Sequence, residues 1–479
     1  MAGIIRHNCG LVVAHTLHDA YSFIKSLQHR GREATGIAAI GKGRIDVVKW
    51  IGPVNRISNK TLHKFFNAGE YHTFFAHVRY ATRGRKDQIL NDAHPHTIGG
   101  VRHDYGSHVH IRDCDMAIIH NGQVDVELLE KEGADLKALR TGCDTEALLL
   151  AFKQGKMDEK ALVNLFKGAY TLAIADKNKD HVLVIRDRLG MKPGVIGWKD
   201  GNYVVASEDV AFIECGAEQE KELRPGSTYK LFPDGSYASE KHAEPKPRHC
   251  FFEWNYLASR KSTLSEVPVK KLREKLGVML AKEHKPEDAD YVTFLPQSPE
   301  DAAKAYSEES RIRFRTVFYK LRDERSFQGS TTTERKNSIN ENLYLRPLIL
   351  KELKGKTLVV IDDSIVRGNN SRHAINMLFD AGVKKIYFLS YTPPIGVIGE
   401  DGKPRGCTWG VDMPPDDSFI ARGRSENEIA RELGQDKPKS AKLEVKYLTT
   451  ESMMKVYESL KMPRNNLCTY CIGGKHPFR

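Results

Sequence analysis

Short apolar segments alternate with amphipathic ones along the first half of the chain. The apolar segments, several rich in β-branched or aromatic residues, have the length of strands and occur at residues 36–40, 74–78, 116–119, 170–175 and 182–185. Helical periodicity separates them at residues 18–28, 144–153 and 160–167. This mixture predicts layered α and β structure, an α+β arrangement, for the first half of the chain.

The second half of the chain has a different order of predicted strands and helices. Apolar strands are predicted at residues 291–295, 357–361 and 385–389, and helices at 265–283, 299–308 and 371–381. Strands and helices that alternate in this way predict an α/β domain with a mainly parallel sheet. Residues 241–249 contain two prolines and several charges, which is typical of a linker. Because 479 residues are too many for one core, we predict two domains, at 9–240 and 241–479.

Composition excludes several classes of protein. The net charge is +12, but Lys and Arg are scattered without a basic tract, so the sequence predicts no nucleic-acid partner. A strongly anionic small substrate accounts for part of the excess. The first eight residues, MAGIIRHN, have no apolar segment and no run reaches membrane-spanning length, which predicts a cytoplasmic protein with no membrane anchor. The eight cysteines are therefore expected to be thiols or metal ligands rather than disulfides.

Residues 356–381 carry the strongest chemical signal. A buried strand is predicted to run into Asp362 and Asp363, followed by a loop of small polar residues at 364–371 and then a helix. A loop and a helix N-terminus present free backbone N–H groups to an anion, and paired carboxylates suit ribose hydroxyls or hydrated Mg²⁺. An ordinary strand–loop–helix unit with an acidic turn is the alternative.

This segment resembles the phosphoribosylpyrophosphate (PRPP) motif of type I phosphoribosyltransferases. The resemblance implies that Asp362 and Asp363 bind the ribose hydroxyls and Mg²⁺, together with Ser298 of a pyrophosphate loop at 295–298. It also implies that the phosphate loop cradles the 5-phosphate with Arg367, Gly368, Asn369, Asn370 and Ser371.

The first half contains a second ordered set of motifs. These are Cys9-Gly10, Gln28-His29-Arg30-Gly31, Ala76-His77-Val78-Arg79, His120-Asn121-Gly122 and Asp144-Thr145-Glu146. In this order they resemble the glutaminase domain of class II amidotransferases, which are N-terminal-nucleophile (Ntn) hydrolases with an αββα sandwich fold. Taken singly, each piece has another interpretation: a buried structural cysteine at Cys9, a surface Arg79, or a hairpin turn at Asn121-Gly122.

The resemblance assigns roles to these residues. Cys9 attacks the side-chain amide of glutamine as a thiolate, because a thiolate is a far stronger nucleophile than a thiol. Asn121 and the N–H of Gly122 form the oxyanion hole. The remaining residues bind glutamine or support the nucleophile: Arg79 holds the α-carboxylate, Asp144 the α-ammonium, and Arg30 and Gly31 the loop around Cys9.

The position of Cys9 carries a prediction of its own. Removal of the initiator methionine cannot expose the amine of a ninth residue, and that amine is the base for the thiol in this family. We therefore expect residues 1–8 to be a propeptide that is cleaved at the Asn8–Cys9 bond. If the propeptide stays attached, glutaminase activity should be very low.

Resemblance extends from Cys9 to Phe478, through segments at 249–256, 325–327, 410–414 and 426–433, and identifies the amidophosphoribosyltransferase family. It implies that ammonia released at Cys9 passes through an enclosed route to C1 of PRPP and displaces pyrophosphate. The product is 5-phosphoribosylamine, in the first committed step of purine synthesis. Family members are often tetramers or dimers that purine nucleotides inhibit, so a homo-oligomer with nucleotide feedback inhibitors is expected.

Four cysteines sharpen the resemblance. A C-x-x-C pair and two distant thiols leave three interpretations open on spacing alone: an iron–sulfur cluster, zinc or unligated thiols. The resemblance to one subgroup of the family implies a [4Fe–4S] cluster, held by Cys250, Cys407, Cys468 and Cys471. The other cysteines with no assigned role, Cys114, Cys143 and Cys215, are expected to be plain core or surface thiols.

Three segments depart from the family pattern. Asn369 and Asn370 replace the usual threonines of the phosphate loop, Gln297 replaces an acidic residue, and Asn340 and Asn342 stand where two basic residues are usual. An amide NH₂ can donate to phosphate in place of the lost hydroxyl. The loss of two cations near the pyrophosphate is expected to weaken PRPP binding unless a nearby basic residue compensates, namely Lys320, Arg322, Arg325 or Arg335. Two further hypotheses follow: a related amidotransferase for another phosphosugar, and a degenerate homologue that binds PRPP or nucleotides as a regulator.

Overall fold

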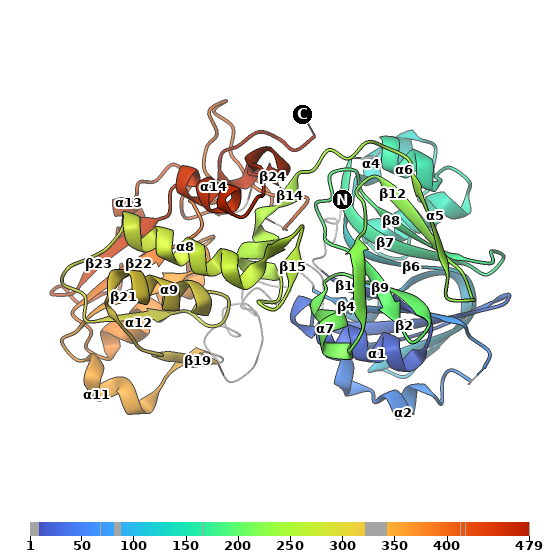
Figure 1. Cartoon of the computed structure of the whole chain (residues 1–479), viewed down its shortest axis with the longest axis horizontal. Helices are drawn as coiled ribbons and strands as arrows, with labels where there is room; N and C mark the ends of the chain where they lie inside the picture. Colours follow the sequence, from blue (N-terminus) through green and yellow to red (C-terminus); the bar gives the residue numbers. More distant parts are fainter. Residues whose placement is uncertain are drawn as a thin grey trace. The chain divides into compact units, whose positions relative to one another are not determined.

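Two compact units make up the chain (Figure 1). The computed structural model describes residues 9–67, 69–80, 88–165, 167–320, 343–411, 413–416 and 418–478. The first unit ends at Cys250 and also takes in residues 409–411; the second begins at Phe251.

Within the described residues, the first unit is built on thirteen strands that pair antiparallel in the order β11-β9-β10-β1-β4-β2-β3-β6-β7-β8-β12-β13, with β5 on β6. Their bounds are β1 (Gly10–Ala14), β2 (Ala34–Gly41), β3 (Arg44–Ile51), β4 (Thr73–Arg79), β5 (His96–Asp104), β6 (His108–Val124), β7 (Gly168–Asp176), β8 (Val182–Arg186), β9 (Val195–Lys199), β10 (Asn202–Ala206), β11 (Glu218–Glu222), β12 (Ser227–Leu231) and β13 (Tyr237–Lys241).

The strands form a sandwich, because successive side chains point alternately to an inner and an outer face of the sheet. Leu11 and Val13 of β1 point into a core shared with β6, β7 and β8, whereas Val12 and Ala14 point to the opposite face. That face packs on α1 (Leu17–Ser26) and α7 (Val210–Cys215). A separate core joins the outer face of β6–β8 to three other helices, α4 (Val126–Lys131), α5 (Asp144–Lys153) and α6 (Glu159–Leu165). The four layers confirm the predicted αββα sandwich (Figure 1).

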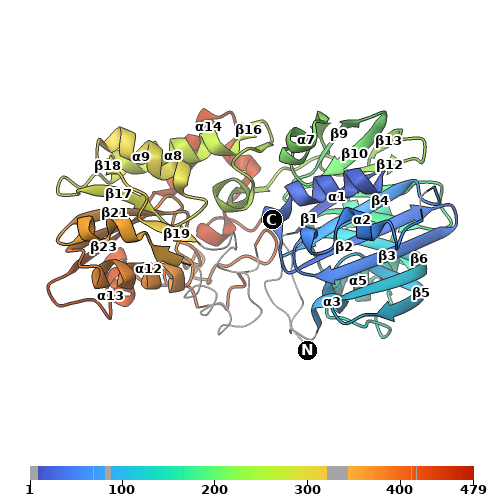
Figure 2. The ribbon, with the colours of Figure 1, turned by 90° about the horizontal axis from the view of Figure 1, so that it is seen from below.

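The second unit contains a five-stranded, all-parallel sheet in the order β18-β17-β21-β22-β23. Its strands are β17 (Tyr291–Phe294), β18 (Arg313–Phe314), β21 (Thr357–Asp362), β22 (Lys385–Ser390) and β23 (Lys442–Tyr447). Helices cover both faces, with α8 (Val269–Glu283), α9 (Glu300–Ser310) and α14 (Thr450–Ser459) on one side and α12 (Asn369–Asp380) and α13 (Glu426–Leu433) on the other (Figure 2). The predicted parallel α/β sheet is confirmed.

Short elements complete the two units. In the first lie α2 (Asn59–Leu62), α3 (Ile89–Asp92) and β14 (His249–Cys250); in the second lie β15 (Thr263–Leu264), β16 (Val267–Pro268), β19 (Phe318–Lys320), β20 (Leu343–Leu345), α11 (Leu350–Leu353) and β24 (Leu467–Cys468). Side chains cap several helices: Thr16 accepts the N–H of Asp19 in α1, and Ser425 and Glu428 form a capping box on α13.

Several predicted elements have other bounds in the structure. The helix expected from residue 265 begins at Val269, because Ser265 and Glu266 have positive φ and turn the chain between β15 and β16. The helix expected from residue 371 begins at Asn369, directly after Gly368. The strand expected at residues 116–119 is the middle of β6, which runs on to Val124.

Several expectations fall outside the described residues: the leader at 1–8, the segment at 325–327, and Asn340 and Asn342. The predicted linker at 241–249 carries backbone bonds to the first unit, from the N–H of Lys246 to Arg188 O and from that of Arg248 to Leu189 O. In the part of the chain that the structure describes, no helix is both long and apolar enough to cross a membrane.

Candidate active site

Polar side chains continue the inner face of the sandwich where its apolar core ends. On β4, Phe75 belongs to the inner core, and the alternation places His77 and Arg79 on the same face. On β6, Ile119 belongs to that core and Asn121 follows on its face. Since β1 pairs with β4 with Gly10 opposite Val78, Cys9 lies beside Arg79. The fold therefore brings residues from three strands to one buried place.

Cys9 is fully buried and fixed on both sides of its peptide backbone. Its N–H donates to Oδ1 of Asn121 at 3.1 Å, and its carbonyl accepts from Nε of Arg30 at 2.9 Å. Arg30 is held in turn by an ion pair with buried Glu208 at 2.5 Å. Gly31 lies against the backbone of Arg79, where a Cβ would come within 2.4 Å of the carbonyl carbon. The loop that carries Arg30 and Gly31 therefore packs directly around the nucleophile candidate.

Two opposing effects act on the pKa of the Cys9 thiol. Burial raises its pKa to about 12, because a thiolate loses its hydration there. The N–H of Tyr80 and the charges of Arg79, Lys192 and Arg30 act in the other direction and lower the pKa. Desolvation wins, so the thiol stays protonated at neutral pH unless a base takes its proton.

Asn121 and Gly122 lie inside β6, opposite Thr171 and Tyr170 of β7, so the hairpin-turn interpretation of this pair is wrong. The Nδ2 group of Asn121 is buried and has no hydrogen-bond partner among the described residues. A buried, unpaired N–H donor costs about 1–3 kcal/mol. Gly122 has φ +145°, and a Cβ there would lie 1.8 Å from the carbonyl oxygen of Ala169. Only glycine fits this position.

Arg79 and Asp144 are both buried and already bonded to other groups. The guanidinium of Arg79 contacts Glu33 at 2.5 Å and Asp92 at 3.5 Å, and its Nε lacks a partner within the described ranges. Asp144, the first residue of α5, accepts the N–H of Val124 at 2.9 Å. Burial raises the pKa of Asp144 to about 6, although the hydrogen bonds that it accepts from Val124 and Thr145 lower this pKa.

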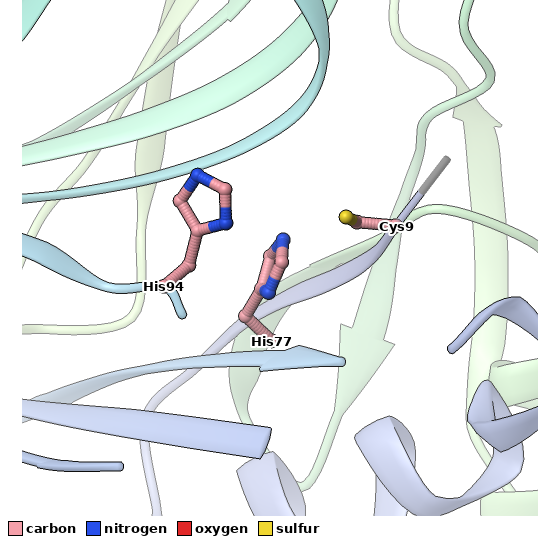
Figure 3. A group of neighbouring side chains, drawn as sticks. All are labelled: Cys9, His77 and His94. Atoms are coloured by element: carbon pink, nitrogen blue, oxygen red, sulfur yellow. The ribbon is translucent and has the colours of Figure 1, made fainter. Parts of the chain in front are cut away.

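A cluster of buried histidines adjoins Cys9 (Figure 3). The rings of His77 and His94 lie 4.2 Å apart between centroids, and those of His94 and His96 lie 4.8 Å apart. Thr145 Oγ1 contacts Nε2 of His94 at 3.0 Å and Nδ1 of His120 at 2.9 Å. Burial lowers the pKa of His77 and of His120 to about 3, so both rings are neutral at pH 7.

The second unit carries the other candidate site, at the carboxyl end of its central strand. Asp362 ends β21 and Asp363 follows it, with 7% and 8% of their surfaces exposed. Oδ1 of Asp362 accepts the N–H of Asp363 at 2.9 Å, and Oδ2 of Asp363 accepts the hydroxyl of Ser364 at 2.9 Å. Burial, and then the neighbouring Asp363, raise the pKa of Asp362 well above its usual value. A bound cation would relieve this repulsion.

Two loops adjoin the carboxylate pair. Residues 364–368 lead from β21 into α12, whose first backbone N–H groups have no partner within the helix. Asn369 and Asn370 are partly exposed and Ser371 is buried in this first turn. Directly after the neighbouring strand β17, the N–H of Leu295 donates to Ile361 O at 3.0 Å, and farther along the Ser298 hydroxyl donates to Tyr256 O at 3.4 Å. The predicted pyrophosphate loop therefore follows the strand next to β21.

The four cysteines of the expected cluster are divided between the units. Cys250 is the last residue before the second unit, which contains the other three. Cys250 and Cys471 are each 5% exposed, and Cys407 and Cys468 are partly buried. In the second unit, Cys407 pairs with Met413 through its backbone, and the carbonyl of Cys471 accepts the N–H of Gly396 at 2.8 Å. Four thiols at buried or half-buried positions are a donor set that fits a soft metal centre.

Some residues of these sites were not predicted from the sequence. Glu208 and Glu33 hold Arg30 and Arg79, yet no spacing pointed to either of them. His77 and Thr145 stood inside the quoted motifs, but their partners come from distant parts of the chain. A histidine cluster could have been expected only from the run of histidines at 94 and 96.

Comparison with known proteins agrees with this picture. A family model described as glutamine amidotransferase domain matches residues 105–214. The amidophosphoribosyltransferase of Methanocaldococcus jannaschii is 32% identical over 95% of this chain and 93% of its own length. That of Archaeoglobus fulgidus is 30% identical over 96% and 94%.

A solved structure extends the likeness to three dimensions. The glutamine PRPP amidotransferase of B. subtilis, in complex with ADP and GMP, has a TM-score of 0.75 and 27% identity, covering 98% of this chain and 97% of its own. Identity at this level over nearly full length, together with the sandwich and the parallel sheet, establishes the relationship. The chain belongs to the amidophosphoribosyltransferase family.

Proposed function

We propose that this enzyme transfers ammonia from glutamine to PRPP, giving 5-phosphoribosylamine, pyrophosphate and glutamate, in the first committed step of purine synthesis. The observation that carries the proposal is the pairing of Cys9 with Asn121, in which the Cys9 N–H orients the amide and the Nδ2 donor is left unpaired in a buried place. Such a donor is costly for stability and useful for an oxyanion.

The glutaminase half needs a base, a nucleophile and an oxyanion hole. The thiolate of Cys9 attacks the side-chain carbonyl carbon of glutamine, and the C–N bond breaks as ammonia leaves with the transferred proton. Water then hydrolyses the thioester to glutamate and restores the thiol. Nδ2 of Asn121 and the N–H of Gly122 stabilise the negative oxygen in both steps.

Removal of residues 1–8 is part of the proposal. Within the intact chain the nitrogen of Cys9 is a peptide N–H, which cannot take a proton, and the thiol has a raised pKa of about 12. Cleavage at the Asn8–Cys9 bond converts this nitrogen to an amine adjacent to the thiol. The amine then supplies the base that the buried thiol needs.

Four residues would hold glutamine and the nucleophile. Arg79 would bind the α-carboxylate through N–H groups that its two acidic partners leave available, and Asp144 would bind the α-ammonium. Arg30 and Gly31 keep the backbone of Cys9 in place, as the bond from Arg30 Nε to the Cys9 carbonyl supports.

In the transferase half we assign PRPP to the carboxyl end of β21. Asp362, Asp363 and Ser298 would hold Mg²⁺ and the ribose, and this carboxylate pair fits a hard cation because its charges are close and buried. When bound, Mg²⁺ neutralises charge on the pyrophosphate leaving group. The 5-phosphate would lie on the first turn of α12, against Arg367, Gly368, Asn369, Asn370 and Ser371.

The departures at Asn369, Asn370 and Gln297 fall on these phosphate contacts. An amide NH₂ donates to phosphate as a hydroxyl does, so the first-turn amides can replace threonines, with backbone N–H groups providing the rest. We therefore favour PRPP as the substrate. A changed phosphosugar and a regulator without turnover remain as distinct outcomes of the test below.

A [4Fe–4S] cluster on Cys250, Cys407, Cys468 and Cys471 belongs to the same proposal. The support is the donor set, four thiols that include a C-x-x-C pair, and not an observed cluster geometry. When bound, the cluster would tie together chain segments far apart in sequence and thereby stabilise the fold.

Regulation, assembly and location stay predictions. The relative from B. subtilis binds ADP and GMP in its structure, which supports purine nucleotides as feedback inhibitors of this chain. A homo-oligomer, tetramer or dimer, and a cytoplasmic location rest on the resemblance and on the sequence alone.

The decisive experiment is Mg²⁺- and PRPP-dependent pyrophosphate release by anaerobically purified protein, with glutamine and separately with ammonia. Release with both, with 5-phosphoribosylamine as product, supports the proposal. Release with ammonia alone means that the leader is retained or Cys9 is inactive. Release from another phosphosugar, or no release by folded protein, would establish one of the two other hypotheses.

A further inference from the structure

We propose that Cys9, His77 and His94 form a binding site for Zn²⁺, and that occupation of this site switches off the glutaminase while the ammonia-dependent reaction continues. Binding rests on the geometry alone, whereas the inhibition also rests on the proposed function. The site lies entirely within the first unit.

Geometry is the first argument. One ligand atom from each of the three residues lies within 4.8 Å of the other two, and all three side chains are buried. Figure 3 shows the sulfur of Cys9 directed toward His77, with His94 beyond. Tetrahedral zinc with bonds of about 2.0–2.3 Å separates its ligand atoms by about 3.3–3.6 Å. Side-chain movements that shorten these separations by up to about 1.5 Å would therefore close the site.

The bonding of the imidazoles is the second argument. Nε2 of His77 lies 3.1 Å from the carbonyl oxygen of His120, to which it donates, and its Nδ1 has no partner in the described part of the chain. Nε2 of His94 is bonded to Thr145 Oγ1. Metal-binding histidines are usually oriented in this way by a hydrogen bond at a ring nitrogen, so both imidazoles are held in place beside the Cys9 sulfur.

A second group, His94, His96 and Cys143, satisfies the same distance criterion and shares His94. Charge separates the two. Cys143 donates its S–H to Asp144 at 3.7 Å, so a thiolate there would face a carboxylate. Cys9 instead has Arg30, Arg79 and Lys192 among its electrostatic neighbours, and these cations favour a thiolate. The observations therefore favour Cys9 as the metal ligand.

The chemistry of occupation follows from the bond that forms. Zn²⁺ accepts a lone pair of the Cys9 sulfur as the S–H bond breaks. The thiol proton passes to solvent, so the thiol releases one proton for each ion that binds. The lone pair in the Zn–S bond is then unavailable to glutamine. Two nitrogens and one sulfur suit zinc better than Mg²⁺ or Ca²⁺, which prefer oxygen ligands.

The binding test uses purified full-length protein and Co²⁺, which reports a thiolate ligand by a charge-transfer band in the near ultraviolet. The variants are His94→Gln and His77→Gln, with His103→Gln as matched control, because His103 is an exposed residue of β5. We expect the wild type and His103→Gln to bind one equivalent more than His94→Gln and His77→Gln. Other thiol sites, including the four cysteines, are common to all the proteins and cancel in this difference.

The inhibition test titrates Zn²⁺ into both reactions. We expect glutamine-dependent pyrophosphate release to fall while ammonia-dependent release continues, and half-inhibition in His94→Gln to need on the order of 100-fold more Zn²⁺. Equal Co²⁺ bands in the wild type, His77→Gln and His94→Gln would overturn the proposed binding site. Equal inhibition of both nitrogen sources would overturn the switch. If no turnover occurs at all, the Co²⁺ difference still decides the binding site independently of the proposed function.

Discussion

Replacement of Asn121 by leucine separates catalysis from stability at the glutaminase site. Leucine has the same number and branching of side-chain heavy atoms, and it removes both the Oδ1 acceptor for the Cys9 N–H and the unpaired Nδ2 donor. Loss of one oxyanion donor typically lowers kcat by about 10²–10³, or about 2.7–4 kcal/mol. We expect this loss in glutamine-dependent turnover, with the KM for glutamine nearly unchanged and ammonia-dependent turnover intact.

Stability should respond quite differently. The substitution leaves the Cys9 N–H unpaired, which costs about 1–3 kcal/mol, but it also removes an unpaired buried donor of similar cost. The two contributions oppose each other, so the free energy of unfolding should change by no more than about 2 kcal/mol.

The assay compares steady-state glutamate formation and pyrophosphate release with urea unfolding, for Asn121→Leu and for the control Asn164→Leu on the exposed face of α6. The control should keep both activities. An unchanged kcat with glutamine in Asn121→Leu would refute the oxyanion role. A large loss of stability with a proportionate loss of both activities would mean that Asn121 is a structural residue.

Four further predictions concern the two sites and the four cysteines of the expected cluster. Cys9→Ala should abolish glutamine-dependent turnover and spare the ammonia-dependent reaction; loss of both would contradict two separate sites. Asp363→Asn should suppress pyrophosphate release with either nitrogen source but leave basal glutaminase, measured as glutamate, and normal release would refute its role. The KM for glutamine should rise as pH falls through about 6, where Asp144 takes up a proton, and Asp144→Asn should remove this pH dependence while raising KM throughout. Anaerobically purified protein should be brown with about four irons per chain, whereas colourless protein with stoichiometric zinc would contradict the cluster.

The same carboxyl has a consequence for folding. The pKa of Asp144 is higher in the folded protein than its ordinary value of 3.8, so folding promotes proton uptake between about pH 4 and 6. Its burial therefore destabilises the fold above pH 6, and this penalty disappears as pH falls toward 4. A substrate ammonium bound beside it at neutral pH would compensate the buried charge.

Local features of the sites could be predicted from the sequence, and contacts between distant segments could not. Asp362 and Asp363 come directly after a predicted strand, so their place at the sheet edge is a property of about ten neighbouring residues. Asn121-Gly122 was ambiguous, because an Asn-Gly pair is typical of a hairpin turn and only pairing with β7 makes it a strand. The partner of Arg30, Glu208, lies 178 residues away and has no motif.

The predicted start of α8 was wrong because the backbone conformation there does not follow the helical pattern of the side chains. Residues 265–268 continue the helical pattern of α8, yet Ser265 and Glu266 have positive φ, which non-glycine residues rarely adopt. Neither residue is Gly or Asn, so the usual signal of such a turn is missing from the sequence. The pairing of β15 with β16 determines the turn there.

The burial of Cys9 connects the leader, the oxyanion donor and the histidine cluster. Burial raises the pKa of the thiol to about 12, so the thiolate is a minor form at pH 7 and the protein must provide a way to remove the proton. If residues 1–8 are removed as we propose, the amine of Cys9 takes this proton only for the duration of the attack and returns it to the leaving ammonia, which makes Cys9 a catalyst. A Zn²⁺ ion held by His77 and His94 would displace this proton for as long as it stays bound, and the zinc-bound thiolate would be inactive. Both routes use the same buried sulfur, so an amine freed by cleavage and a bound Zn²⁺ should oppose each other, and glutaminase activity should depend on which of them holds Cys9.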